Sequence, residues 1–537
     1  MGGIVSAQQP LAVEAGAAAF AKGGNAVDAG LACAFVQGVV DPQMCGLGGA
    51  GTALVHDPET AETVEFDFYP PVPLAATPDM FMPLIEERVR WGGWKLRDFA
   101  NDIGYRSICT PTFVRAAATL HGRYGRLSWT EILAPAIEVA AEGAPVYHAV
   151  HDRWLRGTPG FADSLTRHTV TTAAARIFTK DGRLLQPGER MATQDYARTL
   201  TRLAEMGAED FYHGEIAHRI LDDMTANGGL IRQDDLDRAP VLQGHPLRAR
   251  YRGYMVEAPR PPGGGLVVLE ALRILERFDL RALDHNGPEH LHLVAEALRA
   301  AFADWKTRTG DPAFVDNPIG ELLSDERIDG LAGTIAQDRR AVRSAGDDRL
   351  VPDAKTTTHV SVIDEGGFTF TMTHTLGLAS GVVTDGLGFM YNNAMVLFDP
   401  NPGGPNSIAP GRVRQHGTAA CILLKSGAPV LAIGAPGGHG ICSGVVQAIS
   451  NIVDFDMSPV EAVSAARIHA EGDVIEAEAR IPRAVIAALA ARGHAVNHSF
   501  YSYDYTSGRP HLAVRDPETG VVDGAADPRG GGMVARA

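Results

Sequence analysis

Lys355-Thr-Thr-Thr-His-Val-Ser-Val-Ile-Asp364 is the segment that decides the fold, because it places a threonine at the start of a predicted strand, directly after a charged connection. Residues 359–363 and 368–373 alternate or nearly alternate in polarity, and Glu365-Gly366-Gly367 between them is typical of a turn. These residues predict a β-hairpin with Thr357 at its head. Three threonines alone also fit an ordinary strand start, because β-branched residues favour strands.

The connection upstream of the hairpin, residues 338–353, is rich in charge, poor in apolar residues and interrupted by glycine and proline. This composition predicts a flexible loop. A threonine hydroxyl is a weak nucleophile at neutral pH and needs an adjacent base. If the chain is cut between Thr356 and Thr357, the new α-amine, with a reference pKa of about 7.7–8.0, supplies that base on the nucleophile itself.

Residues 357–364 resemble the start of the small subunit in the γ-glutamyltranspeptidase family of N-terminal nucleophile hydrolases. Other blocks resemble the same family, in order, along nearly the whole chain. These blocks are residues 4–51 with the glycine loop Gly46–Gly51, Asn227-Gly-Gly-Leu-Ile231 with Asp235-Leu236, Pro261-Pro-Gly-Gly-Gly265, Gly310-Asp-Pro-Ala-Phe314, Ala435-Pro-Gly-Gly438 and Ala526-Asp-Pro-Arg529. No single block is decisive, and the ordered set carries the resemblance.

The resemblance implies an α+β fold, the four-layer αββα sandwich of this superfamily. It also implies self-cleavage into a large subunit, residues 1–356, and a small subunit, residues 357–537, which stay together as one intertwined domain. The protein is then a heterodimer of its own two fragments, and a higher oligomer stays open.

The resemblance also assigns catalytic roles. Thr357 is the expected nucleophile, and Thr375 is expected to hydrogen-bond it. Gly437 and Gly438 match the pair whose backbone N–H groups form the oxyanion hole. Glycine suits this role, because consecutive amides can point at one oxygen only where the backbone is unrestricted and no side chain blocks the approach. An ordinary turn is the alternative interpretation of this glycine pair.

The family's ligands for a glutamyl group are missing from the matching positions. After Asn392-Asn393, Ala394 and Leu397 stand where an amide or acidic residue and an aspartate are expected, and His416-Gly417 stands in place of a serine pair. A buried ammonium or carboxylate without a partner costs several kcal/mol. We therefore expect an ordinary γ-glutamyl substrate to bind poorly.

In the family, an arginine in an early segment of the chain binds the carboxylate of the substrate. The matching segment here, residues 66–71, reads Phe-Asp-Phe-Tyr-Pro-Pro and contains no arginine. The alternative is that an arginine enters the site from a loop, and the candidates are Arg88, Arg90 and Arg97.

The predicted substrate pocket is more apolar than the family's and carries imidazoles; it contains Tyr391, Asn393, Ala394, Leu397, Phe398, His416 and His439. Each of the two histidines is a candidate for recognising a carboxylate or a hydroxyl group. The alternative for each is a hydrogen-bonded structural histidine.

The predicted function is that of a self-processing amidohydrolase or acyltransferase. Thr357 attacks a small acyl amide or peptide, and water or an amine resolves the acyl-enzyme. Three alternatives stay open: ordinary γ-glutamyl transfer or glutathione hydrolysis, an activity like that of cephalosporin acylases, and an unprocessed relative that only binds.

Neither a cofactor nor a metal is predicted. Gly46–Gly51 matches the G-x-G-x-x-G pattern of dinucleotide sites, but it follows a predicted helix and precedes a predicted strand, the reverse of the required order. The cysteines show no C-x-x-C spacing, and no H-E-x-x-H sequence occurs. His290 and His292 are expected to be surface or core-edge residues.

Composition limits the partners. The formal net charge of −16 opposes binding to nucleic acid, and no apolar run is long enough for a membrane span. Five scattered cysteines in 537 residues fit a reducing compartment, and the cytoplasm is the expected location.

Capping boxes predict helices from Ser128 and from Ser458, the second with proline at its first position. Periodicity predicts further helices at residues 195–206, 265–278, 289–305 and 482–492, and a strand at 429–433.

Overall fold

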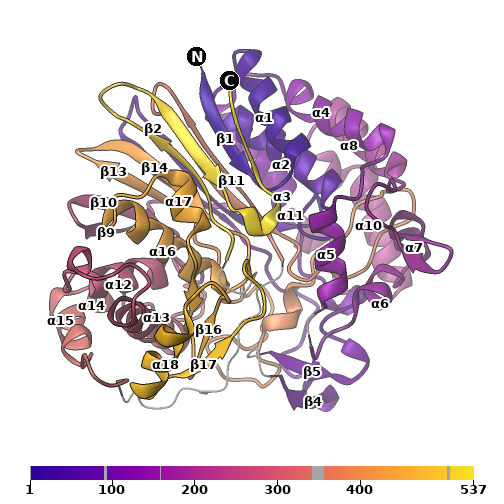
Figure 1. The fold of residues 1–537 in the computed structure, drawn as a ribbon. Coiled ribbons are helices and arrows are strands. Elements are labelled where there is room, and N and C mark those ends of the chain that lie inside the picture. The colour runs from indigo at the N-terminus through magenta and orange to yellow at the C-terminus, as the bar shows by residue number, and fades with distance from the viewer. Residues whose placement is uncertain (1, 90–92, 158, 342–355, 505–507) are drawn as a thin grey trace.

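The structure is a computed structural model that describes residues 2–89, 93–157, 159–341, 356–504 and 508–537. Two large antiparallel sheets lie face to face at its centre, and helices cover the outer face of each sheet (Figure 1). The predicted four-layer αββα sandwich is confirmed. Most of the connection at 338–353 lies outside the described residues.

The first sheet has seven strands. In spatial order they are β20 (Met533–Arg536), β1 (Gly3–Ala7), β11 (Thr358–Asp364), β12 (Thr369–Thr375), β2 (Ala50–Asp57), β3 (Glu62–Phe68) and β8 (Leu242–Gly244).

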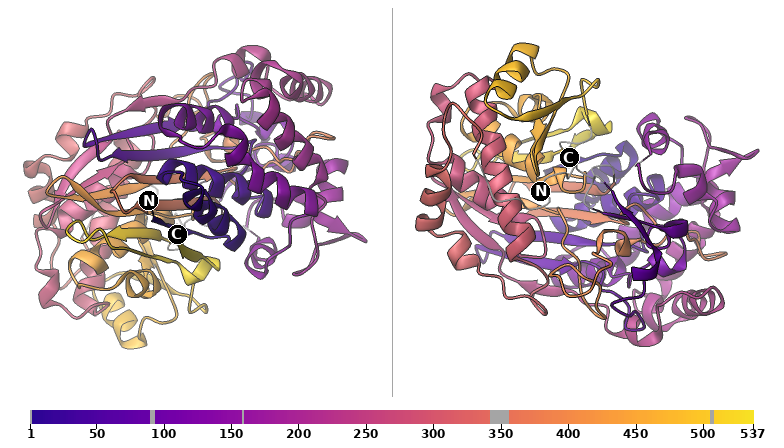
Figure 2. Two further views of the ribbon diagram at one scale, coloured as in Figure 1. Left: turned by 90° about the horizontal axis from the view of Figure 1, so that it is seen from above. Right: turned by 90° about the horizontal axis from the view of Figure 1, so that it is seen from below.

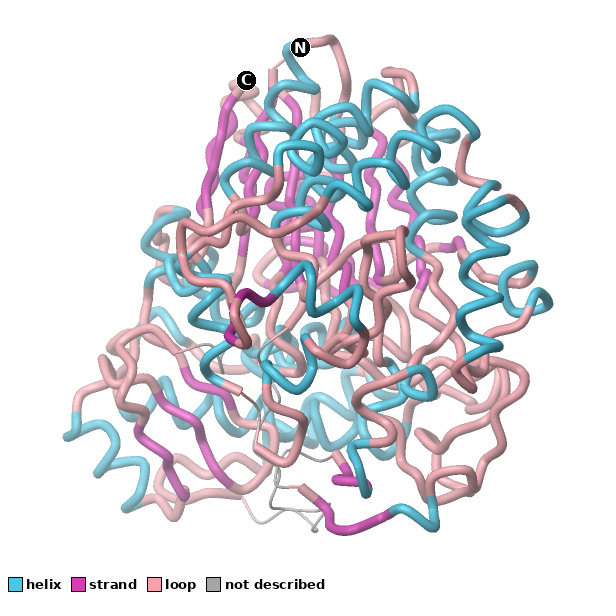
Figure 3. Tube along the Cα trace, turned by 90° about the vertical axis from the view of Figure 1, so that its right-hand side faces the viewer, coloured by secondary structure: helices cyan, strands magenta, loops and turns pink. Residues whose placement is uncertain are grey.

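The helices on the outer side of this sheet come from the first half of the chain, and Figure 3 views the molecule from their side. They are α1 (Pro10–Ala21), α2 (Ala26–Val40), α3 (Phe113–Tyr124), α4 (Trp129–Glu142), α5 (His148–Arg156), α6 (Ser164–His168), α7 (Thr172–Phe178), α8 (Gln194–Met206), α9 (Asp210–His213), α10 (Glu215–Ala226) and α11 (Gln233–Asp237). The largest apolar core lies between α1, α2 and the sheet.

The second sheet has six strands. In spatial order they are β19 (Val522–Ala526), β18 (His511–Arg515), β14 (Ala428–Gly434), β13 (Cys421–Lys425), β10 (Tyr254–Ala258) and β9 (Leu247–Tyr251). A second apolar core joins this sheet to its helices. Those helices are α12 (Gly265–Leu275), α13 (Pro288–Arg308), α14 (Ile319–Leu322), α15 (Asp325–Gly333), α16 (Gly440–Val453), α17 (Pro459–Ser464) and α18 (Arg483–Ala491).

Both halves of the chain contribute strands to both sheets, as Figure 2 shows by colour. In the first sheet, β11 lies between β1 and β12, so a strand from the start of the chain pairs with one from residues 358–364. The two halves on either side of Thr357 therefore form one intertwined unit.

Smaller sheets lie at the periphery. They are the three-stranded sheet of β15 (Ile468–His469), β16 (Val474–Ala477) and β17 (Ala495–His498), and the hairpins β4 (Ile85–Arg88) with β5 (Trp94–Leu96) and β6 (Thr179–Lys180) with β7 (Arg183–Leu184).

Local sequence signals explain the element boundaries. The capping boxes at Ser128 and Ser458 start α4 and α17 as predicted. Asn25 caps α2 in the same way. The predicted hairpin is β11 and β12, paired in register from Thr358 opposite His374. The helix predicted at 265–278 ends earlier, at Leu275, and the chain turns there.

Polar side chains fill part of the interface between the two sheets. Ser361 donates to the backbone oxygen of His511 across the interface at 3.0 Å, and Thr52 contacts the Thr418 hydroxyl at 3.2 Å. His359 bonds the hydroxyls of Thr373 and Ser361, both at 2.8 Å. This layer is buried, so its hydrogen bonds replace those that the same groups would make to water.

Among the described residues, no helix combines the length and the apolar character needed to cross a bilayer.

Several histidines in the core are held neutral. Burial lowers the pKa of His374 to about 3, and it lowers the pKa of His511, beside Arg509 and Arg467, to about 3 as well. Burial also lowers the pKa of His359 well below its usual value. Each of these groups takes up a proton near pH 6.5 only in the unfolded chain.

This difference predicts acid sensitivity. Stability is complete above pH 6.5 and falls as the pH drops toward the folded pKa, by about 1.4 kcal/mol per pH unit for each such histidine. We expect His374→Gln to weaken the pH dependence between about pH 5.5 and 4.5 by about one proton, because there this histidine is protonated in the unfolded chain and neutral in the folded one. Urea unfolding at several pH values measures this slope, and an unchanged slope contradicts the assignment.

Candidate active site

Thr357 directly precedes β11, whose pairing with β12 begins at Thr358 opposite His374, so Thr357 comes next to Thr375. The two hydroxyl oxygens, Thr357 Oγ1 and Thr375 Oγ1, are 2.9 Å apart. Thr375 Oγ1 also accepts a hydrogen bond from the Gly377 amide at 2.9 Å. The predicted contact between the two threonines is therefore present.

Thr357 has an unusual backbone conformation. Its φ is 92°, although the chain is continuous through Thr356. A β-branched residue avoids positive φ, and such a conformation costs about 1–3 kcal/mol. Thr357 is also buried, at 5% exposure. The strain is stored at the bond that the sequence predicts to be cut.

Gly437 and Gly438 connect β14 to α16. Their φ angles are 136° and 56°, a region that favours glycine. A side chain on the neighbouring Gly417 would place its Cβ 2.4 Å from the Gly438 oxygen, so the turn is also closely packed. The amides of the pair donate no hydrogen bond to any residue that the structure describes. They precede the N-terminus of α16, which is favourable for negative charge.

One cavity, here called the Thr357 cavity, brings Thr357, Thr375 and Gly438 together, whereas Gly437 is not part of its lining. It contains about 400 Å³ of empty space, its mouth included. It is lined by Tyr69, Thr356, Thr357, Thr375, Gly377, Leu378, Val396, Leu397, Arg414, Gly417, Thr418, Gly438, His439 and Ile441.

Arg414 is the cationic side chain in the described wall of this cavity. Its Nη2 donates to the Tyr69 hydroxyl at 2.8 Å, and its Nη1 donates to the Gln415 oxygen at 2.9 Å. Its Nε is buried without a hydrogen-bond partner among the described residues. The residue is 4% exposed, and its hydrogen bonds to described residues go to a hydroxyl and a backbone oxygen, not to a carboxylate. A buried guanidinium in this state favours an anionic ligand.

His416 supports this arrangement from behind. Its ring stacks on Tyr69 with centroids 3.6 Å apart, and its Nδ1 bonds the Thr418 hydroxyl at 2.7 Å. Burial lowers the pKa of His416 well below its usual value, and nearby Arg414 lowers it further. His416 therefore holds Tyr69 as a neutral ring and is not part of the cavity wall.

Other predicted pocket residues lie behind the wall. The Tyr391 hydroxyl bonds the Thr384 hydroxyl at 2.8 Å in the core. Ala394 and Phe398 pack in a separate apolar cluster. Of the predicted substrate-binding residues, Leu397 and His439 line the cavity.

Asn393 shapes the wall indirectly. Its Oδ1 accepts from the amide of Leu378, a wall residue, at 2.8 Å, and its Nδ2 donates to the Asp102 carboxylate at 2.9 Å. The same carboxylate accepts from Arg167 at 2.8 Å, and both partners of this ion pair are buried. Asp102 thus anchors the loop that carries Gly377 and Leu378.

The alternative arginines are elsewhere. Arg88 stacks on Trp94 with 5.5 Å between its Cζ and the ring, and Arg97 donates to the Pro83 oxygen at 3.0 Å on the surface. Arg90 lies outside the described residues. Sequence reasoning missed both Arg414 and Tyr69. A signal was present, because Arg414 stands two residues before His416 and Tyr69 belongs to the segment searched for an arginine.

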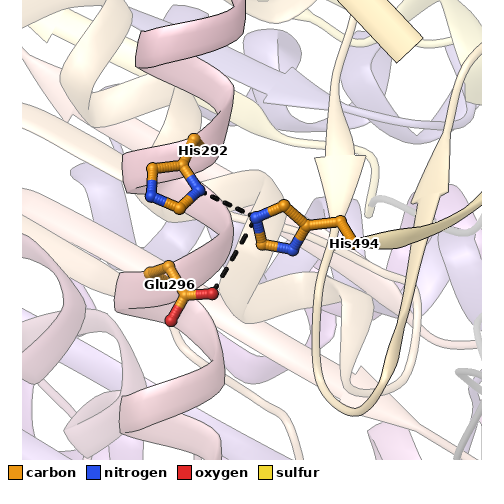
Figure 4. A group of neighbouring side chains, drawn as sticks. All are labelled: His292, Glu296 and His494. Carbon is orange, nitrogen blue, oxygen red and sulfur yellow. Dashed lines mark hydrogen bonds and ion pairs between the residues drawn. The ribbon is translucent and has the colours of Figure 1, made fainter. Parts of the chain in front are cut away.

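A second cluster of ionisable side chains offers three possible metal ligands: His292, Glu296 and His494 (Figure 4). His292 Nδ1 and His494 Nε2 are 2.8 Å apart, and Glu296 Oε1 pairs with Arg299 at 2.9 Å. Burial and positive neighbours, His292 and Arg299 first among them, lower the pKa of His494 to about 3. Arg299, which is paired with Glu296, and the nearby Arg340 repel a metal cation, so we interpret the cluster as a structural hydrogen-bond group. His290 and His292, predicted as surface or core-edge residues, are both buried.

Comparison with known proteins gives concordant matches. The family model described as gamma-glutamyltranspeptidase matches residues 12–537. The acylase ACY 1 proenzyme of Pseudomonas sp. (strain V22) is 35% identical over 98% of this chain and 91% of its own length. The glutathione hydrolase proenzyme of Escherichia coli (strain K12) is 30% identical over 98% of this chain and 90% of its own length.

Solved structures agree with this match. The cephalosporin acylase from Bacillus halodurans superposes with a TM-score of 0.85 and 28% identity, covering 99% of this chain and 95% of its own. A gamma-glutamyltranspeptidase from Helicobacter pylori superposes with a TM-score of 0.56 and 28% identity, covering 64% of this chain and 93% of its own.

The buried pair of Arg167 and Asp102 makes a testable contribution to stability. We expect Asp102→Ala to lower the free energy of unfolding by about 3–5 kcal/mol, because it leaves a buried guanidinium without its carboxylate. Asp152→Ala is the matched control. It removes a partly exposed ion pair with Arg156 and should change stability by less than about 1 kcal/mol. Urea unfolding measures both, and equal effects contradict the anchoring role.

Proposed function

Because this chain belongs to the γ-glutamyltranspeptidase family, an enzyme family of N-terminal nucleophile hydrolases, we propose that it is a self-processing hydrolase that cleaves an acyl amide through an ester on Thr357. The observation that carries the proposal is the shared cavity of Thr357, Thr375 and Gly438. In this proposal the nucleophile, its hydroxyl partner and the oxyanion donors all face one bound carbonyl group.

The backbone strain at Thr357 supports self-processing. Thr357 Oγ1 attacks the carbonyl carbon of Thr356, and the peptide nitrogen leaves as the free α-amine. The resulting ester is hydrolysed by water, which separates residues 1–356 from 357–537. Cleavage releases the positive φ of Thr357, because φ of an N-terminal residue is no longer restrained by a preceding carbonyl. The new amine then serves as the base for its own hydroxyl.

The charges of the cavity favour a particular acyl group. Arg414 offers a partner for a carboxylate, and no carboxylate is present in the described wall to pair with an ammonium group. Leu378, Val396, Leu397 and Ile441 supply apolar surface between the polar groups. We therefore propose a short acyl group that ends in a carboxylate and lacks the α-amine of a γ-glutamyl group.

Two other functions are weaker candidates. Ordinary γ-glutamyl transfer fits the carboxylate but leaves the substrate ammonium without a partner in the described wall. A relative that only binds has no need for a strained threonine beside two glycine amides.

Intact-mass spectrometry tests the nucleophile. Wild type and the control Thr357→Ser should each give two fragments that meet between residues 356 and 357, because serine keeps the hydroxyl group. Thr357→Ala should give one full-length chain and no amidase activity. An uncut wild-type chain favours the binding alternative, and fragments that meet elsewhere reassign the nucleophile.

Three p-nitroanilides test the acyl group: glutaryl, γ-glutamyl and pentanoyl. They share a five-carbon acyl chain and differ in the carboxylate and the amine. We expect kcat/KM to be highest for the glutaryl compound. Arg414→Met should lower that value by about 30-fold to 1000-fold, because a buried charge pair is lost, and should barely change the value for pentanoyl.

Arg412→Met is the matched control on the same segment. Arg412 donates to the Ser407 oxygen at 2.8 Å and is not part of the cavity wall. Its replacement should preserve the preference for the glutaryl compound. Equal losses for glutaryl and pentanoyl substrates in Arg414→Met would refute carboxylate recognition by Arg414.

A further inference from the structure

A second set of polar side chains reaches the Thr357 cavity beside the glycine pair. His439 directly follows Gly438, precedes α16 and lines the cavity. Its Nδ1 donates to the Glu471 Oε1 at 2.8 Å. The ring is also packed by Trp305, which lies nearly perpendicular at 5.1 Å between centroids. His439 is thus an oriented imidazole beside the expected oxyanion site.

Glu471 is held as firmly as the imidazole. Its carboxylate is 2% exposed, and Lys306 Nζ lies 2.6 Å from Oε1. His469 Nε2 approaches Oε2 at 3.3 Å, and its Nδ1 bonds the Ser443 hydroxyl at 2.7 Å. Although burial opposes ionisation, Lys306 and His439 hold the pKa of Glu471 well below its usual range. Glu471 is therefore a fixed carboxylate.

This contact determines the tautomer of His439. Because Nδ1 carries the proton that Glu471 accepts, Nε2 of the neutral ring carries the lone pair. Nε2 is on the opposite edge of the ring from Glu471. A histidine whose other nitrogen donates to a carboxylate is the arrangement that general bases use in hydrolases.

We propose that His439 is the general base that activates water for hydrolysis of the acyl ester on Thr357, and that Glu471 positions it. This inference rests on the proposed function, because it requires an acyl-enzyme. It assigns a second base to the site besides the α-amine of Thr357.

Hydrolysis of the ester begins with proton transfer to the imidazole. His439 Nε2 takes a proton from water while the water oxygen forms a bond to the acyl carbon. The carbonyl electron pair moves to the oxygen held by the Gly437 and Gly438 amides. When that pair returns, the bond from carbon to Thr357 Oγ1 breaks, and the threonine oxygen takes the proton from Nε2. The products are the free acid and the free Thr357 hydroxyl.

The proposal distinguishes hydrolysis from transfer. Water is a poor nucleophile at neutral pH and gains from a base, whereas hydroxylamine attacks an ester without one. A positioned base contributes about 10²–10⁴-fold to a rate. Loss of His439 should therefore slow hydrolysis of the ester far more than its cleavage by hydroxylamine.

The test uses His439→Gln in the processed enzyme, with the best of the three anilides as substrate. We expect a rapid burst of nitroaniline followed by turnover slowed about 100-fold or more. Intact mass should show the acyl group on the fragment that begins at Thr357, and hydroxylamine should restore turnover. Glu471→Gln should show the same accumulation to a smaller degree.

Two comparisons keep the result interpretable. His285→Gln is the control, because His285 is a partly buried histidine that bonds Asn451 at 2.9 Å and is not part of the cavity wall. It should leave deacylation unchanged. An unchanged urea midpoint shows that His439→Gln is folded. Its self-cleavage, which also passes through an ester on Thr357, is followed by intact mass until it is complete before turnover is measured. His439→Ala, with added imidazole as an external base, should regain part of its deacylation rate.

The pH dependence of the deacylation rate distinguishes a general base at His439 from a residue that only packs. Deacylation in the wild type should slow as the pH falls and the imidazole is protonated, and His439→Gln should lack this limb. Among the described residues, the other titratable or charged groups near the ring are Glu471, Lys306, His469, His416 and Arg414. The α-amine of Thr357 in the processed enzyme also titrates, and because it is present in both proteins the comparison with His439→Gln isolates the imidazole.

Slow turnover without an acylated fragment, unrelieved by hydroxylamine, overturns the role of His439 in deacylation. That outcome leaves the nucleophile intact if Thr357→Ala remains uncut and inactive. By contrast, an active Thr357→Ala enzyme contradicts the proposed function itself.

Discussion

The backbone pairing of β11 is the constraint on which the rest of the structure depends. All seven residues of this strand are buried, so every amide and carbonyl in it needs a partner inside the protein. β1 and β12 supply those partners on its two edges. The pairing joins the start of the chain to residues near 360 and holds Thr357 at a defined place at the end of the first sheet.

The second sheet completes the site because it is pressed against the first. β14 leads into Gly437 and Gly438, and the Thr418 hydroxyl meets Thr52 across the interface. Hydrogen-bonded polar groups in this layer have directional requirements that an apolar layer lacks. They therefore limit sliding of one sheet over the other, and with it movement of the glycine amides relative to the threonine hydroxyl.

The charge of the cavity depends on which of its ionisable side chains have a charged partner within the protein. Glu471 is surrounded by Lys306 and two histidines, so its charge is balanced within the protein. The hydrogen bonds that Arg414 makes to described residues go to Tyr69 and Gln415, and its Nε has no described partner. Water or a ligand must then solvate the Arg414 guanidinium. The charge of Glu471 is therefore structural, whereas the charge of Arg414 is available to bind a ligand.

The amino-acid sequence by itself determined the fold class, the hairpin and the pairing of Thr357 with Thr375. These features rest on short-range patterns: alternation, turn residues, capping boxes and an ordered set of family blocks. The contact between Thr357 and Thr375 was implied by the family resemblance, and the observed hairpin register explains it, because the register brings together residues that are close in sequence.

Only the tertiary structure decided which distant side chains reach the cavity. Tyr69 and Arg414 are 345 positions apart and hydrogen-bonded, while His416, two residues beyond Arg414, is turned behind the wall and stacked on Tyr69. Neighbours in a loop can face opposite directions, because loop side chains follow no fixed period. Their roles depend on packing between segments that no local pattern relates.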